Sequence, residues 1–179
     1  MLWGTLRNDP FATDATVVFV QEAVGPAHGM TTPGGVFVRR AEFDDKVAIE
    51  ALIGEDAHTI GKRFGSFDVT NMIECASLGI TAVNETGAVV GYAAFYDQPS
   101  QAAEVDAAQW PDWLHKNFGH PDYSAANTVW MTFFVADHLC QNEVAEYILR
   151  TAFTTLTSID AILFALPDDV RPFAPIRET

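Results

Sequence analysis

The residues best suited to chemistry in this sequence follow an apolar run at residues 129–135 and precede an amphipathic stretch. A strand that leads into a helix is a common anion site, because the first helical amides are unpaired and the helix dipole favours negative charge. Here the corner at residues 137–143 reads Asp-His-Leu-Cys-Gln-Asn-Glu, without glycine and with a carboxylate at each end. The corner therefore has the position of a phosphate site, but its side chains oppose a phosphate.

Three histidines could act as general bases toward an amine, because imidazole titrates near neutral pH. They are His115, His120 and His138, and no second catalytic group accompanies them at a diagnostic spacing. We therefore interpret them as surface or helix-end residues. Glu143 is another candidate base, but it lies in the corner where a bound anion would be expected. The sequence thus predicts no catalytic residue.

The two cysteines, Cys75 and Cys140, are far apart and form no metal-binding motif, so we expect reduced thiols, no disulfide and no metal site. A helix N-terminus can activate a thiol, but the acidic neighbours of Cys140 would oppose thiolate formation. We interpret the acidic pairs at 44–45 and 168–169 as helix caps or solvated chain ends.

Composition restricts the class of protein. With 179 residues, of which 49% are hydrophobic, the chain can bury one substantial core. Its 24 acidic and 10 basic residues leave a formal net charge of -14, so we expect neither nucleic acid nor a membrane as a partner. No stretch approaches the roughly 18 apolar residues that cross a bilayer, and no signal peptide begins the sequence. We expect an unsecreted, cytosolic protein.

Strand and helix patterns that could position the corner alternate from residue 36 onward. Strand-like runs occupy residues 36–40, 78–83, 88–96, 129–135 and 161–166, and helical patterns occupy 44–55, 69–76, 106–118 and 144–156. Residues 84–87 join the second and third runs as a hairpin turn, and residues 58–64 are predicted to form a turn. We therefore predict an α/β, or α+β, fold with a central mixed sheet flanked by helices.

The chain divides into segments of different character. We assign residues 1–35 to an N-terminal extension, 36–170 to a domain with an inserted loop at 97–127, and 171–179 to a tail. The extension contains one strand-like run at 15–20, which could form an edge strand, and otherwise glycine and proline punctuation.

The order of elements between residues 36 and 166 resembles the acyl-coenzyme A dependent N-acetyltransferase fold, and residues 88–93 are similar to its third strand. In active members, a Gln/Arg-x-x-Gly-x-Gly/Ala turn after the fourth strand wraps the cofactor pyrophosphate. The equivalent residues here are Cys140, Gln141, Asn142, Glu143, Val144 and Ala145, of which only Ala145 fits. Glu143 replaces the glycine that lets the backbone approach the pyrophosphate. The resemblance therefore implies a degenerate turn and no coenzyme A cofactor.

The resembled fold normally continues with a helix and two strands after its fifth strand. Too few residues follow Pro167 for these elements, so we predict a truncated version of the fold. The strand at 161–166 would then lie at an open edge, which invites pairing with another chain.

A narrower resemblance covers residues 36–170, which are similar to the N-terminal domain of cilia- and flagella-associated protein 61. It is carried by the order and spacing of blocks at 38–42, 76–81, 94–99, 110–114, 134–136, 147–153 and 162–167. The resemblance implies a non-catalytic scaffold of the ciliary axoneme that belongs to the calmodulin- and spoke-associated complex and supports motility. Its implied partners are other axonemal proteins of the radial spoke base, and it would be cytoplasmic before assembly.

Two other functions stay open. One is an acyl-coenzyme A dependent N-acetyltransferase with an atypical cofactor turn, and the other is a sensor that kept the cleft between the central strands without the chemistry.

Trp110 and Trp113 are the interaction candidates, because aromatic anchors carry much of the energy of protein interfaces. They could instead pin the inserted loop to its own domain. The acidic residues around them suit a basic partner surface.

Overall fold

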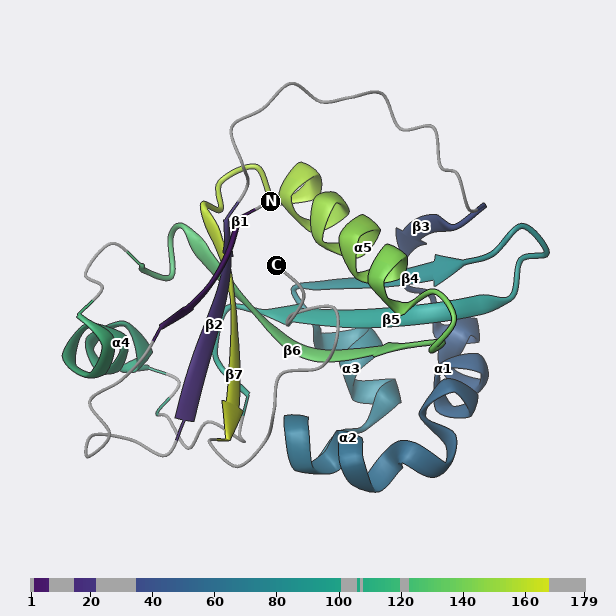
Figure 1. The fold of residues 1–179 in the computed structure, drawn as a ribbon, viewed down its shortest axis with the longest axis horizontal. Coiled ribbons are helices and arrows are strands. Elements are labelled where there is room, and N and C mark those ends of the chain that lie inside the picture. The colour runs from purple at the N-terminus through teal and green to yellow at the C-terminus, as the bar shows by residue number, and fades with distance from the viewer. Residues whose placement is uncertain are drawn as a thin grey trace.

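The computed structural model of the chain describes residues 2–6, 15–21, 35–100, 106, 108–119 and 123–167, the first two ranges as backbone only. Within these ranges seven strands form one sheet in the order β1-β2-β7-β6-β5-β4-β3 (Figure 1). The strands are β1 (Leu2–Leu6), β2 (Ala15–Gln21), β3 (Phe37–Arg40), β4 (Leu78–Val83), β5 (Val89–Tyr96), β6 (Thr128–Ala136) and β7 (Ala161–Pro167). Only β6 and β7 are parallel neighbours, so the described sheet is mixed, as predicted.

Helices cover both faces of this sheet (Figure 1). One face carries α5 (Gln141–Thr155), and the other carries α1 (Lys46–Ile53), α2 (Ala57–Phe64) and α3 (Val69–Cys75). The short 3-10 turns η1 (Phe43–Asp45) and η2 (Gly54–Asp56) flank α1, and α4 (Trp110–Phe118) packs near the start of β6. The predicted α/β class and the predicted order of elements from residue 36 to 166 are confirmed.

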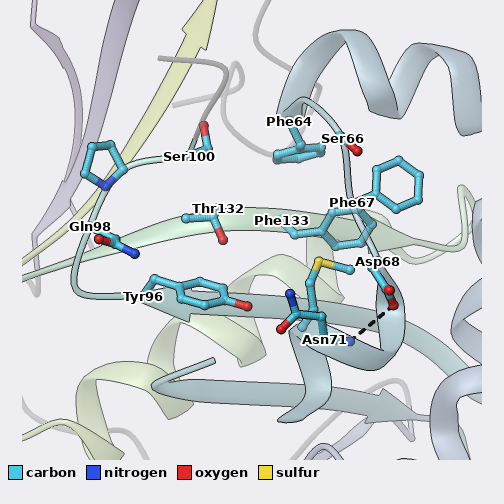
Figure 2. A pocket seen from close by; sticks show the side chains of 12 residues that line it. Phe64, Ser66, Phe67, Asp68, Asn71, Tyr96, Gln98, Ser100, Thr132 and Phe133 are labelled. Carbon is cyan, nitrogen blue, oxygen red and sulfur yellow. Dashed lines mark hydrogen bonds between the residues drawn. The ribbon is translucent and has the colours of Figure 1, made fainter. Parts of the chain in front are cut away.

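One local prediction in this region is wrong, because residues 58–64 belong to a helix, α2, rather than to a turn. Ile60 and Phe64 lie four residues apart and are both buried, which gives the short helix one apolar face. Gly65 ends α2 with a φ of 82°, a conformation that glycine adopts without strain. Figure 2 shows Phe64 at this end of the helix, close to Phe133 of β6.

The N-terminal strands decide how the sheet ends beyond β7. β2 pairs with β7 in antiparallel fashion from Ala15↔Pro167 to Gln21↔Ala161, and β1 pairs with β2 on its outer side. The predicted open edge at residues 161–166 is therefore wrong, because the segment before residue 36 covers it. The strand predicted at residues 15–20 is confirmed, although it lies between two strands rather than at an edge. The domain boundaries themselves stay a prediction.

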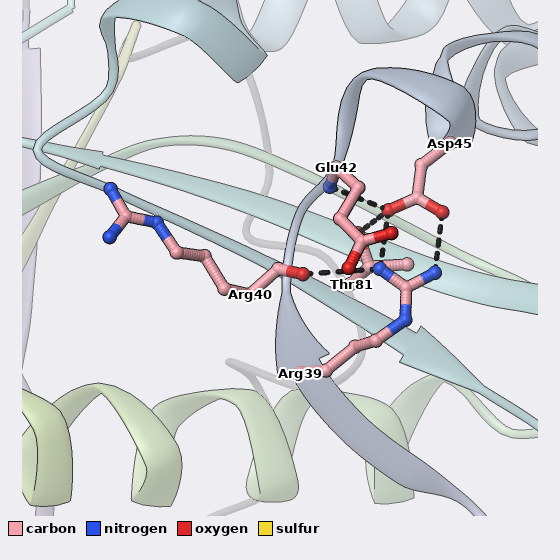
Figure 3. Close-up of polar contacts among 5 residues, drawn as sticks. All are labelled: Arg39, Arg40, Glu42, Asp45 and Thr81. Atoms are coloured by element: carbon pink, nitrogen blue, oxygen red, sulfur yellow. Dashed lines mark hydrogen bonds and ion pairs between the residues drawn. The ribbon is translucent and has the colours of Figure 1, made fainter.

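A buried carboxylate joins β3, β4 and the start of α1 (Figure 3). Arg39 Nη1 and Nη2 donate to Asp45 Oδ2 and Oδ1 at 2.8 and 2.6 Å. The Glu42 backbone N–H and the Thr81 hydroxyl donate to Asp45 Oδ2, each at 2.9 Å. Burial raises the pKa of Asp45, but the hydrogen bonds from Arg39, Glu42 and Thr81 outweigh burial, so this pKa lies below its ordinary value.

Removing this carboxylate should weaken the fold most at neutral pH. We expect Asp45→Asn to lower the free energy of unfolding by about 2 kcal/mol at pH 7, because Arg39 and Thr81 lose a charged acceptor. Since the folded pKa of Asp45 is depressed, its contribution is complete above the unfolded pKa of about 4 and is lost as the pH falls further. Urea unfolding between pH 7 and pH 3 should therefore show the two proteins converging in acid.

The neighbouring acidic residue supplies the control for this comparison. Asp44 is exposed, so Asp44→Asn removes the same charge without touching the network. We expect it to change the free energy of unfolding by less than about 0.5 kcal/mol. An equal effect of the two substitutions would show that net charge, rather than the Arg39 contact, sets the stability.

Candidate functional site: the corner between β6 and α5

The predicted anion corner lies between the end of β6 and the first turn of α5. The Asp137 N–H donates to Val90 O at 2.9 Å, which holds the start of the corner beside β5. The Leu139 N–H donates to the Asp137 carboxylate at 2.9 Å, and the Cys140 N–H donates to the Asp137 carbonyl at 3.1 Å. Two amides of the corner are thus bonded to Asp137 and cannot also bind a phosphate.

Glu143, the residue expected to block this corner, lies in the first turn of α5. Burial raises the pKa of Tyr147, one turn further along α5, and the neighbouring Glu143 carboxylate adds to this rise. Among the described hydrogen bonds, the carboxylate that accepts from the amides of the corner belongs to Asp137. The carboxylate of Asp137 therefore engages the corner, and the blocking role expected of Glu143 stays a prediction.

The other residues of the degenerate turn serve packing or lie at the surface. Val144 and Ala145 are buried in the core, whereas Asn142 is exposed. A Cβ at Gly91 of β5 would collide with Val144 Cγ1, so this glycine allows α5 to pack directly on the sheet. Burial raises the pKa of the Cys140 thiol, and the charges of two neighbouring carboxylates add to this rise. The thiol is therefore less reactive than an ordinary cysteine.

A hollow of about 480 Å³ adjoins the corner, between β6 and the helices α1 and α2. Its lining includes the carboxylates of Asp56 and Asp137 together with Arg63, His138 and Gln141. His138 Nε2 lies 3.3 Å from Asp56 Oδ2, so this pair joins the corner to η2. Burial lowers the pKa of Arg63, against the charge of Asp56. Two carboxylates in the lining make the hollow a poor site for a pyrophosphate.

An aromatic side chain packs against both parallel strands where they separate. β6 and β7 pair only from Thr128↔Ala161 to Trp130↔Leu163, and Figure 1 shows them running apart beyond these residues. The Phe64 ring of α2 lies 5.2 Å from the Phe133 ring of β6 and 5.4 Å from the Phe164 ring of β7. Phe64 is 4% exposed. A ligand that entered between the strands would have to displace this ring.

The structure places the candidate residues His115 and His138 on different elements. His115 lies on α4, near the start of β6, and His138 lies in the corner that follows its end. Both are exposed, and His120 lies outside the described residues. Cys75 is exposed at the end of α3, away from Cys140 in the corner. No catalytic constellation is formed by these four described side chains.

The two tryptophans proposed as interaction candidates differ in their surroundings. Trp110 is 2% exposed, crosses the Trp130 ring edge-on at 5.3 Å, and donates from Nε1 to Asp97 O at 3.1 Å. These contacts fit the alternative that it pins the inserted loop to its own domain. Trp113 is partly buried and packs edge-on against Phe118. Its role at an interface stays a prediction.

Sequence reasoning missed the two residues that close this region, Asp137 and Phe64. Asp137 could have been found, because an aspartate two residues before an amide commonly accepts its hydrogen. Phe64 could be identified only as an apolar neighbour of Ile60, since its contacts come from β6 and β7.

Among the described residues no cluster of histidine, cysteine and acidic groups could hold a metal ion. None of the described helices has the length and apolar character of a membrane span.

Comparisons with known proteins give the following relatives. The family model described as cilia- and flagella-associated protein 61, N-terminal domain, matches residues 37–178. Cilia- and flagella-associated protein 61 of Tetrahymena thermophila is 23% identical over 144 residues, which are 72% of this chain and 8% of that protein. The chain thus spans a small part of this relative.

Solved structures with a similar fold are N-acetyltransferases. A GCN5-related N-acetyltransferase from Kribbella flavida has 15% identity and a TM-score of 0.41, with 70% of this chain and 66% of that chain covered. A GNAT family N-acetyltransferase from Escherichia coli, solved in complex with CoA, has 16% identity and a TM-score of 0.40, with coverages of 72% and 60%. At these values neither enzyme carries an argument about the chemistry of this chain.

Proposed function

This chain belongs to the family of the N-terminal domain of cilia- and flagella-associated protein 61, and we propose that it is a non-catalytic interaction module of the ciliary axoneme. The family is one of cilium- and flagellum-associated proteins. Our finer proposal is that the module associates with the radial spoke base and the calmodulin- and spoke-associated complex, after a cytoplasmic stage, and supports motility. The net charge of -14 favours protein partners over nucleic acid or membranes.

The observation that supports a non-catalytic role is the position of the Phe64 ring. Its ring contacts one ring on each of the two diverging strands, in the cleft where an acyl group and its carrier would have to lie for transfer. At the mouth of this cleft, Asp137 already accepts from a backbone amide that a phosphate would need. A cofactor would therefore have to break packing and hydrogen bonds that the fold already contains.

Acetyl-coenzyme A should leave the stability of the purified chain unchanged. A ligand at 100 times its dissociation constant adds about 2.7 kcal/mol to the free energy of unfolding, so binding is readily detected in urea unfolding. We expect no change with 1 mM acetyl-coenzyme A, beside an active acetyltransferase as the positive control. Stabilisation of this size would contradict the proposal.

The alternative function is an acyltransferase, and the observation in its favour is that β6 and β7 do separate beyond Trp130. Transfer of a radiolabelled acetyl group to a protein amine would establish it, provided that Asp137→Ala, which frees the corner amides, changes the rate.

The location can be tested separately by expressing the tagged chain in ciliated cells and extracting them with detergent. We expect the chain in the axonemal fraction, and recovery in the soluble fraction alone would contradict an axonemal role.

A further inference from the structure

A second hollow, which the corner does not share, lies between the end of β5, the middle of β6 and the start of α3 (Figure 2). Its volume is about 270 Å³. One side of it is aromatic and the other is polar, with lining side chains that include Phe64, Phe67, Phe133, Tyr96, Asp68, Asn71, Gln98, Ser100 and Thr132. Small-molecule sites usually measure about 300–1,000 Å³, so this hollow suits a single side chain better than a cofactor.

The charge of this hollow is negative. Among the described residues that line it, Asp68 is charged and none is a lysine or an arginine. Asp68 Oδ1 accepts from the Thr70 and Asn71 amides at 2.8 and 3.2 Å, and in the described hydrogen bonds its Oδ2 accepts from none. One carboxylate oxygen is therefore available to a donor from outside.

Several neutral polar groups of the hollow also lack partners. Among the described hydrogen bonds, none involves the Tyr96 hydroxyl or the side-chain amides of Asn71 and Gln98. Figure 2 shows these side chains gathered on the polar side of the hollow. Burial raises the pKa of Tyr96 further above physiological pH, so its hydroxyl is a neutral donor and acceptor. These groups offer oxygen acceptors next to partly exposed aromatic rings.

We propose that this hollow receives one arginine side chain from a basic protein partner. A guanidinium is planar, stacks on aromatic rings and donates five hydrogens, which matches a carboxylate oxygen and amide oxygens beside Phe67 and Tyr96. The chain has 24 acidic and 10 basic residues, and its net negative charge attracts a basic partner. The inference deepens the proposed function as an interaction module and rests on it.

A short peptide can probe the hollow without knowledge of the partner. We would titrate the uniformly 15N-labelled chain with acetyl-Gly-Arg-Gly-amide and follow the backbone amides by NMR. The matched probe is the same peptide with citrulline, which keeps the shape of arginine and removes its charge. We expect the arginine peptide to shift the amides of Asn71 and Gln98 and to bind on the order of fivefold more tightly than the citrulline peptide.

Two matched variants separate the hollow from the overall acidity of the chain. Asp68→Asn removes the charge and keeps an oxygen that can cap α3. It should raise the dissociation constant of the arginine peptide about fivefold. Asp106→Asn is the control, because it removes the same charge outside the hollow. Like Asp68, Asp106 accepts a hydrogen bond from the amide two residues further on, here from Ala108 N at 2.9 Å. It should leave the dissociation constant within about twofold.

The outcomes distinguish this inference from the proposed function. Equal binding of the two peptides, shifts away from Asn71 and Gln98, or an equal loss in both variants would overturn the arginine site. None of these results bears on whether the chain binds acetyl-coenzyme A, which is the separate test of a non-catalytic role.

Discussion

Phe64→Ala should lower the free energy of unfolding by about 3–5 kcal/mol, because it leaves a cavity beside the rings of Phe133 on β6 and Phe164 on β7. The ring is 4% exposed, so its apolar surface is lost from the core almost completely. β6 and β7 are paired over only three residue pairs. To fill the space left by the ring, the two strands would have to form new pairs beyond Trp130↔Leu163. Urea unfolding at pH 7 measures this change directly.

Phe43→Ala is the matched control for this prediction, since it removes the same side chain from the surface. Phe43 is 58% exposed, and we expect its substitution to change the free energy of unfolding by less than about 0.5 kcal/mol. Similar values for the two variants would show that Phe64 does not hold the diverging strands together. Phe64 would then be no obstacle to a cofactor in this cleft.

Removal of residues 1–21 should be the most damaging change to the fold. It takes away β1 and β2 and leaves β7 with an unpaired edge along its whole length. Residues 161–166 are all apolar and at most 4% exposed in the intact chain, so this edge would invite association. We expect a fall in melting temperature of about 10 °C, together with oligomers in light scattering, since each 1 kcal/mol lost moves the melting temperature by about 2–4 °C.

A shorter deletion provides the comparison. Removal of residues 1–6 takes away β1 and leaves β2 in place over β7. This variant should stay monomeric and lose less than half as much melting temperature as the longer deletion. Monomeric, unchanged behaviour after removal of residues 1–21 would contradict the role of β2 as the cover of β7.

Most of the fold between residues 36 and 166 could be predicted because its signals are local. The hairpin of β4 and β5 follows from its turn, in which Asn84 Oδ1 accepts from the Thr86 and Ala88 amides at 3.0 and 2.9 Å and Gly87 has a φ of 81°. The periodicity of α3 and α5 likewise places their apolar residues on one face each. Such patterns need only neighbours in sequence to be interpreted.

The candidate site could be predicted in position but not in mechanism. The corner after β6 was located from the strand and the helix around it. The bond from Leu139 N–H to the Asp137 carboxylate spans only two residues, so it could have been predicted from the sequence, but the interpretation centred on Glu143 instead. The helix α2 was missed because it spans only eight residues and its apolar face rests on two large side chains, Ile60 and Phe64.

The sequence by itself determined the class of fold, the acidic character of the surface and the loss of a glycine-based phosphate turn, because each depends on residue types or short spacings. Only the tertiary structure decided that Phe64 fills the cleft between β6 and β7 and that the N-terminal strands cover β7. Both contacts join segments that are far apart in the chain. Their partners are chosen by the packing of the whole sheet, which no local pattern encodes.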